Sequence, residues 1–389
     1  MKRTGGEIVA ERLTVTLLSA PLESPVRMSF SQLNARQVCL VEIEASGLVG
    51  VGETWINYPP WGAQERLATL TEGVAPLILG LDVSSPPAVL ERLSTAMLPI
   101  ARQWGAPGPI WQALSGIDLA LWDLVGKAAN TSVASLLKPD RVPTKRVPAY
   151  ASGVGPDTVV ELCESAIEQG FRAVKTKVGF GHERDTDIVS KARFTIGGDV
   201  KLFADANQAW GLEEATAFCK SMVEYRVDWL EEPIAGDRVK DLLALKSQTG
   251  MALAGGENLY GIDTFAKYLE SGALHIVQPD LTKSGGITIG QRIAERAATA
   301  KTDVAPHCYG GAVGIAAALQ LADANEGFAW IELDIRSNPL REDLLQVPLE
   351  FSHGGLRVPA GAGLGIELNQ ETLHRYMIHR EERTYRDFR

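Results

Sequence analysis

Three carboxylates follow apolar segments at equal intervals in the middle of the sequence. Asp205 ends the segment KLFAD, Glu231 ends DWLE, and Glu257 follows MALAGG. If each segment is a strand of one parallel sheet, the three side chains converge, and they repel one another unless a cation lies between them. Oxygen ligands with room for water and substrate suit Mg²⁺. The spacing predicts a magnesium site, although each carboxylate taken singly has the alternative of an ion pair or a helix cap.

Two lysines lie on the segment AVKTKV, before these carboxylates. Lys175 and Lys177 are two residues apart, so both ammonium groups leave a strand on the same face. Each lysine disfavours the charge of the other, and burial adds to the effect, so we expect a lysine pKa lowered toward neutrality and a lysine that can act as a general base. In the alternative interpretation only one lysine points inward and the other reaches solvent.

Other polar residues end the segments that flank the carboxylates. Asp280 ends HIVQPD and His307 lies near the end of DVAPHC. A carboxylate can hold an imidazole in one tautomer and raise its basicity, which predicts a second base, although a single histidine after a proline is often structural. Lys283 and Glu332 are predicted to hydrogen-bond a substrate oxygen or, alternatively, to form ion pairs in the wall. Asn207 and Glu232 are predicted to orient a metal ligand or hold water.

A magnesium ion between a lysine base and a histidine base suits one elementary reaction. One base removes the proton on the carbon next to a substrate carboxylate, and the metal with a lysine neutralises the enediolate that results. Return of a proton by the opposite base gives racemisation or epimerisation. Protonation of a β-hydroxyl or ring oxygen gives dehydration or ring opening. We therefore expect a small-molecule carboxylate as substrate.

Eight strand-like segments are required to position these residues. Each is apolar, ends in charged, amide or imidazole side chains and is followed by an amphipathic helical segment, except that the first ends in Ser152. This repeat predicts a closed parallel (β/α)₈ barrel with its reactive groups at the carboxyl ends of the strands. An open doubly wound sheet is the alternative, but the glycines after the first segment do not continue as G-x-G-x-x-G. The segments are residues 147–152, 173–178, 201–207, 228–233, 251–258, 275–280, 303–308 and 329–334.

The sequence before the barrel has a different pattern. Short β-rich runs between residues 13 and 53 predict an antiparallel meander, and helical patterns follow over residues 63–79 and 87–104 and from Pro109. We therefore divide the chain into an α+β capping domain at 1–140, a (β/α)₈ barrel at 141–335 and a C-terminal segment at 336–389 that packs back on both.

Composition excludes several classes of protein. The chain has 389 residues with a net charge of −10 and no basic patch, which argues against a nucleic-acid or anionic-membrane partner. Four scattered cysteines without a Cys-x-x-Cys pair indicate neither a disulfide framework nor a zinc site. No signal peptide or membrane span is visible, so a cytoplasmic protein with reduced thiols is expected.

The ordered motifs KTK, DAN, EEP, GEN, QPD, PH and IE, behind an α+β cap, resemble those of the enolase superfamily, specifically its mandelate racemase subgroup. The resemblance implies that Asp205, Glu231 and Glu257 bind Mg²⁺. It also implies that Lys177 is one acid/base. Lys175 would lower the pKa of Lys177 and polarise the carboxylate of the substrate. The resemblance implies that the Asp280–His307 dyad is the second acid/base. It implies that Glu332 forms a hydrogen bond with the substrate.

The resemblance further implies a magnesium-dependent lyase or isomerase, with homo-oligomers common. Dehydration of an acid sugar is the first prediction, and the alternatives are a racemase or epimerase of a 2-hydroxy acid or a cycloisomerase of a sugar lactone. The segments KTKVGFG, ALSGIDLALWDLVGK and PHCYGGAVGIAAALQ are similar to those of galactarolactone cycloisomerases.

In this family the cap sets specificity, which directs attention to residues 24–32 and 54–61. Arg27 is predicted to meet a distal hydroxyl or carboxylate of the substrate. Trp55, Tyr58 and Trp61 are predicted to shield the site from water. The alternative is that these aromatic residues simply pack between the two domains.

The sequence disfavours two other functional classes. A metal-dependent hydrolase on the same barrel would normally use a His-x-His pair, and the six histidines form none. A binding or scaffold protein that lost its chemistry is not favoured, because both predicted bases and all three predicted ligands are present.

Overall fold

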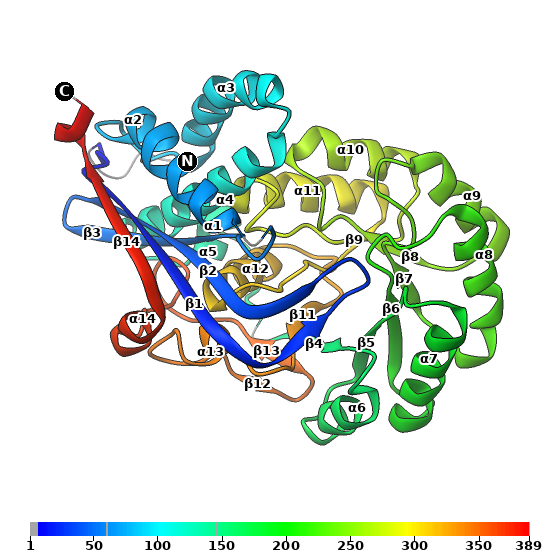
Figure 1. Cartoon of the computed structure of the whole chain (residues 1–389). Helices are drawn as coiled ribbons and strands as arrows, with labels where there is room; N and C mark the ends of the chain where they lie inside the picture. The colour runs from blue at the N-terminus through cyan, green and yellow to red at the C-terminus, as the bar shows by residue number, and fades with distance from the viewer. Residues whose placement is uncertain (1–6, 60, 145, 389) are drawn as a thin grey trace.

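The computed structural model describes residues 7–59, 61–144 and 146–388. It contains a four-stranded antiparallel sheet with helices, which we call the cap, and a barrel of parallel strands surrounded by helices (Figure 1). Of the cap residues singled out from the sequence, only Pro60, inside the segment 54–61, lies outside the described residues.

The cap sheet contains the predicted meander. Its strands β1 (Arg12–Arg27), β2 (Gln32–Ala45) and β3 (Leu48–Thr54) pair antiparallel in sequence order. Ser46 and Gly47 both have positive φ, as the two central residues of a tight type I′ hairpin require. The fourth strand, β14 (Met377–Thr384), comes from the far end of the chain and pairs with the outer edge of β1, where Figure 1 shows it in red beside the blue strand.

The helix α4 (Pro107–Ala128) packs directly on β3 and is almost entirely buried. Two glycines of β3 allow this close approach. A Cβ atom on Gly50 would lie 2.1 Å from the Ala120 carbonyl oxygen, and one on Gly52 would lie 2.1 Å from the Gly116 carbonyl oxygen. The other cap helices are α1 (Gly62–Ala68), η1 (Thr69–Val74), α2 (Ala75–Ile78), α3 (Pro86–Trp104) and α5 (Val133–Leu137).

The predicted (β/α)₈ barrel is confirmed, and each of the eight segments overlaps one of its strands. Neighbouring strands from β4 to β10 pair in parallel, β11 pairs with the other edge of β4, and a bridge between Val304 and Phe328 links β10 to the segment before β11. The strands are β4 (Arg146–Val154), β5 (Ala173–Lys177), β6 (Lys201–Asp205), β7 (Trp229–Glu231), β8 (Leu253–Gly255), β9 (Ile276–Val277), β10 (Asp303–Val304) and β11 (Ile331–Asp334).

Helices cover the outside of the barrel, and aromatic side chains fill its floor. Tyr150, Phe203 and Trp229 are buried together inside the ring of strands, so the polar groups above them face a closed base. The outer helices are α6 (Val159–Glu168), α7 (His182–Ile196), α8 (Leu212–Ser221), η2 (Val223–Tyr225), α9 (Val239–Thr249), α10 (Gly261–Ser271), α11 (Gly286–Ala300) and α12 (Ala312–Ala324).

The C-terminal segment contains a short hairpin that continues the barrel sheet at β4, followed by a helix and the strand that joins the cap. Its elements before β14 are α13 (Pro339–Glu342), β12 (Phe351–Ser352), β13 (Gly355–Arg357) and α14 (Gln370–Tyr376), and η3 (Tyr385–Phe388) follows β14.

Two buried carboxylates of the cap hold the beginnings of barrel helices. Glu53, in β3, accepts hydrogen bonds from the backbone N–H of Gly311 at 2.6 Å and of Gly314 at 2.9 Å, at the start of α12. Asp118, on α4, accepts from the backbone N–H of Thr288 at 2.9 Å, in the first turn of α11. A helix N-terminus has free N–H donors and a partial positive charge, so these contacts fix the cap against the barrel.

No helix within the described ranges has the length and apolarity that a membrane crossing needs. All four cysteines are buried as free thiols.

Candidate active site

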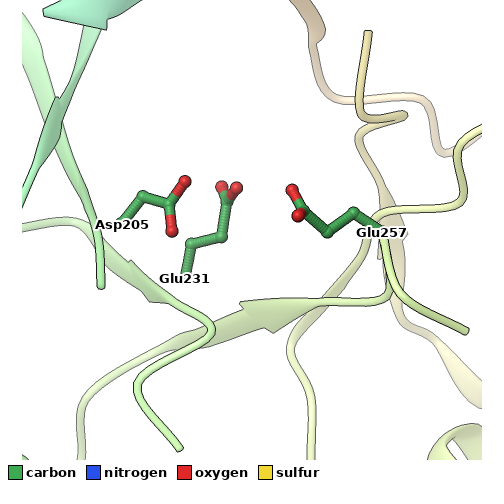
Figure 2. A group of neighbouring side chains, drawn as sticks. All are labelled: Asp205, Glu231 and Glu257. Atoms are coloured by element: carbon green, nitrogen blue, oxygen red, sulfur yellow. The ribbon is translucent and has the colours of Figure 1, made fainter. Parts of the chain in front are cut away.

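The three predicted metal ligands converge at the mouth of the barrel. Asp205 ends β6 and is in register with Glu231, which ends β7, while Glu257 follows β8. One carboxylate oxygen from each residue lies within 4.8 Å of the other two (Figure 2). Parallel pairing of adjacent strands produces this arrangement, because it brings successive strand ends to the same edge of the sheet.

The chemistry of this group fits a hard divalent cation. Burial and then repulsion by Asp205 raise the pKa of Glu231 to about 8, which shows how costly three close carboxylates are without a counter-ion. The Oε2 atom of Glu257 is buried and accepts no hydrogen bond of good geometry among the described residues, and its nearest cationic neighbour is the His307 Nε2 at 3.1 Å. Three oxygen ligands, one of them with an oxygen that accepts no such hydrogen bond, suit Mg²⁺.

Both predicted lysines are buried and point into the mouth. The Lys175 Nζ lies 2.6 Å from Glu231 Oε1 and 3.0 Å from Glu332 Oε1. The Lys177 Nζ lies 2.5 Å from Asp205 Oδ2 and donates to Asn207 Oδ1 at 3.0 Å. The alternative in which one lysine reaches solvent does not hold.

The expected lowering of a lysine pKa is wrong for this state of the protein. Burial lowers the pKa of Lys177, and the charge of Lys175 lowers it further, but attraction to Asp205 and the other carboxylates raises it above the ordinary lysine value. The pKa of Lys175 is raised in the same way, because Glu231 and Glu332 outweigh burial. The carboxylate partners, which the spacing of the two lysines does not indicate, outweigh the repulsion between them.

The Asp280–His307 pair forms as predicted from its chemistry. The Nδ1 of His307 lies 2.7 Å from Asp280 Oδ2, and Thr282 donates to the other carboxylate oxygen of Asp280 through its N–H at 2.7 Å. This leaves the His307 Nε2 facing the site, 3.1 Å from Glu257 Oε2. Burial lowers the pKa of His307, but attraction to Glu257 and Glu332 raises it to about 9.

Glu332 lies in β11, on the far side of Lys175 from Glu231. It accepts a hydrogen bond from the Cys308 backbone N–H at 3.2 Å. Burial raises the pKa of this carboxyl. The positive charges of Lys175, His307 and Lys177 lower it by more, so the pKa falls to about 2. Glu332 therefore stays ionised and able to accept a hydrogen bond.

A cavity of about 470 Å³ opens above these groups, between the cap and the barrel. Eight of the residues predicted from sequence line it, namely Trp55, Tyr58, Lys177, Asn207, Glu232, Glu257, Lys283 and His307. Its apolar wall comes mainly from the cap, and its charged wall from the barrel.

Arg27 is not part of the cavity lining. Its side chain is 61% exposed, and its nearest carboxylate is Asp157 at 3.7 Å. Met28 and Phe30 line the cavity instead. Arg27 is the last residue of β1, whereas Met28 and Phe30 lie in the turn before β2, where the Met28 N–H donates to the Ser31 carbonyl oxygen at 2.9 Å.

Sequence reasoning missed several residues of the lining. Asn258 directly follows Glu257 in the motif GEN, so its position next to a predicted ligand was a usable signal. The others carry no such signal, because they come from the cap helix α4 and from loops: Gln112, Gln208, Tyr260 and Tyr309.

Two family profiles match almost all of the chain. Residues 12–138 match the mandelate racemase / muconate lactonizing enzyme N-terminal domain. Residues 158–372 match the enolase C-terminal domain-like family.

Individual proteins are similar over nearly their full lengths. D-galactarolactone cycloisomerase of Agrobacterium fabrum is 33% identical over 378 residues, which cover 93% of this chain and 97% of that protein. Arabinonate dehydratase of Saccharolobus solfataricus is 29% identical over 87% of this chain and 90% of that protein. The crystal structure of a racemase from Streptomyces coelicolor with bound magnesium superimposes with a TM-score of 0.84 at 26% identity, and the match covers 95% of this chain and all of that one.

Proposed function

The chain belongs to the enolase superfamily, in its mandelate racemase subgroup, and from that premise we propose that it catalyses a magnesium-dependent β-elimination on an acid sugar. It is an enzyme of the mandelate racemase / muconate lactonizing enzyme type. The observation that carries the proposal is the placement of Lys177 and His307. They line one cavity beside the three carboxylates, and they extend from opposite sides of the barrel mouth.

Two bases on opposite sides of a substrate can move protons at two atoms. One accepts the proton on the carbon next to the carboxylate, which breaks the C–H bond and places the electron pair in an enediolate. The other delivers a proton to the oxygen on the β carbon as the C–O bond breaks. When bound, Mg²⁺ would act as a Lewis acid on the substrate carboxylate and would offset the carboxylate charges that raise the pKa of Lys177 and His307.

Other residues hold this arrangement in place. Asp280 orients His307 through Nδ1, so that Nε2 is the atom that exchanges protons with the substrate. Glu332 keeps Lys175 in position through their ion pair, and its carboxylate can accept a hydrogen bond from the substrate. The aromatic residues Trp55 and Tyr58 cover the cavity from the cap and exclude water from the enediolate.

Dehydration is our first candidate, in which the departing group is a hydroxyl and the product becomes a 2-keto acid. Ring opening of a sugar lactone is the second, because the relative at 33% identity is a galactarolactone cycloisomerase. The two reactions share the same proton abstraction and the same β C–O cleavage. They differ only in whether the departing oxygen belongs to a ring.

Proton NMR in D₂O tests the proposal. The protein with Mg²⁺ is incubated with aldonic and aldaric acids, their lactones and aryl hydroxy acids. A new keto-acid or ring-opened product supports β-elimination. Loss of the α-proton signal with an intact carbon skeleton would instead show a racemase or epimerase, and no exchange with any of these acids would refute the proposed chemistry.

A further inference from the structure

Three lysines line or underlie the cavity, and one of them differs from the other two. Lys175 and Lys177 each have a carboxylate oxygen at 2.6 Å or less. Lys283 is equally buried at 3% exposure, yet among the described residues no carboxylate lies within 4.0 Å of its ammonium. Burial lowers the pKa of Lys283, but attraction to Glu257 and other neighbours outweighs burial and raises it, so Lys283 is a charged ammonium whose carboxylate neighbours in the described part of the chain all lie beyond ion-pair distance.

Most of the hydrogen-bonding capacity of Lys283 is unused. Its Nζ donates to Asn258 Oδ1 at 3.0 Å and lies 4.9 Å from the centre of the Trp55 ring. An ammonium group has three donors. The remaining donors face the cavity that Lys283 lines.

Two further donors line the cavity with Lys283. Buried Arg66 donates to the Oε1 of Gln112 at 2.6 Å, and this fixes the orientation of the amide. The Nε2 of Gln112 is therefore turned toward the Tyr260 hydroxyl, 3.5 Å away. We call Lys283, Gln112 and Tyr260 the donor corner, and all three line the cavity.

The donor corner lies across the mouth from Lys177. Lys177 ends β5 and Lys283 follows β9, which are four strands apart in a ring of eight. Trp55 of the cap packs against Lys283, so the corner extends from the barrel toward the cap. A ligand that reaches both places must be longer than the reacting end alone.

We infer that the donor corner binds a second carboxylate of the substrate, so that the enzyme prefers dicarboxylic acids to the matching monocarboxylic acids. A cation beside an oriented amide donor and a hydroxyl is suited to a carboxylate, and charge-assisted hydrogen bonds are the stronger kind. The inference rests on the proposed function, because it identifies the substrate class of the same site. Glu257 and Glu232 also attract Lys283, and an ammonium that only offsets these two charges would show no preference between acids.

The test is a ratio of affinities measured without turnover. Adipate and hexanoate have the same chain length and differ by one carboxylate, and each is titrated calorimetrically into the protein with Mg²⁺. The wild-type protein should bind adipate about tenfold or more tightly. Lys283→Met should bring the ratio close to one, and Lys283→Arg should restore part of it. Equal binding of the two acids by the wild type, or an unchanged ratio in Lys283→Met, would overturn the inference.

Controls separate this role from a structural one. Lys267→Met removes a lysine outside the cavity and should keep the wild-type ratio. Mg²⁺ affinity and the melting temperature are measured for every variant. If Lys283→Met weakens Mg²⁺ and both acids equally, Lys283 is structural and the inference is wrong. Solvent exchange of the α proton tests the proposed function separately: exchange without a diacid preference overturns only the inference.

Discussion

The two walls of the cavity were built in different ways. The barrel wall consists of ionisable groups at successive strand ends, where nearly every charge faces an opposite charge, as with Lys175 and Glu231. The cap wall consists of apolar and aromatic side chains from a strand end and a loop, such as Met28 and Trp55. We therefore propose that the barrel wall moves protons, while the cap wall and the donor corner determine which molecule binds. Each prediction below tests that division.

Removal of a carboxylate from the barrel wall should have the largest effect. Asp205→Ala removes a predicted metal ligand and the partner of Lys177, so Mg²⁺ binding should be lost and turnover should fall by about 10³-fold or more. Calorimetric titration of Mg²⁺ and a turnover assay measure this, and circular dichroism checks the fold. Undiminished wild-type activity in excess chelator would contradict the metal assignment.

Replacing a base should reduce turnover by about 10²- to 10⁴-fold. His307→Asn should stop hydrogen exchange from one face of the α carbon, and Lys177→Ala from the other, because the two side chains extend from opposite sides of the mouth. Exchange in D₂O with substrates of both configurations distinguishes the faces. Wild-type exchange on both faces in both variants would show that the two bases do not act in this way.

A change in the cap wall should alter substrate binding more than the chemical step. Trp55→Ala removes a buried ring that packs against His307 and Lys283, so KM should rise about tenfold, with a smaller fall in kcat. Trp104→Ala is the matched control, because Trp104 is 56% exposed and does not line the cavity. A kcat loss as large as that of His307→Asn would break the division between the two walls.

The smallest effect on turnover should come from Glu53→Gln, which alters the contact between the walls. Burial raises the pKa of Glu53 to about 7, despite the hydrogen bonds from Gly311 and Gly314. In an unfolded chain the pKa of glutamate is about 4.3. Between that pH and the folded pKa of about 7, Glu53 keeps a proton in the folded protein that the unfolded chain has released. The wild-type free energy of unfolding should therefore fall as pH rises from about 4.3 to about 7.

Glu53→Gln lacks this titration, so its stability relative to the wild type should increase over the same pH range, by roughly 1–3 kcal/mol. Urea denaturation of both proteins at several pH values measures the difference. Two parallel stability curves would show that Glu53 is already ionised at low pH in the folded protein.

The barrel could be predicted from the sequence because its pattern repeats. Asp205 and Glu231 each follow a short apolar run, and parallel pairing then dictates that they meet. The protonation state of Lys177 could not be predicted, because it depends on how closely Asp205 approaches, which no spacing gives.

The cap was less predictable, because its cavity lining depends on orientation within non-repeating segments. The charge of Arg27 suggests a substrate contact, but the turn that joins β1 to β2 brings Met28 and Phe30 to the cavity instead. The strand β14 has the sequence MIHREERT, with no alternation of apolar residues to indicate a strand. Its pairing with β1 follows from the tertiary fold alone.

The pairing of β14 with β1 has a consequence for synthesis. Ribosomes make chains from the N-terminus, so β1 emerges early, and β14 follows only after the whole barrel has been made. During that time the outer edge of β1 has unpaired N–H and C=O groups, which can pair with other nascent chains. The fourth strand of the cap sheet can therefore be added only after the barrel has been made.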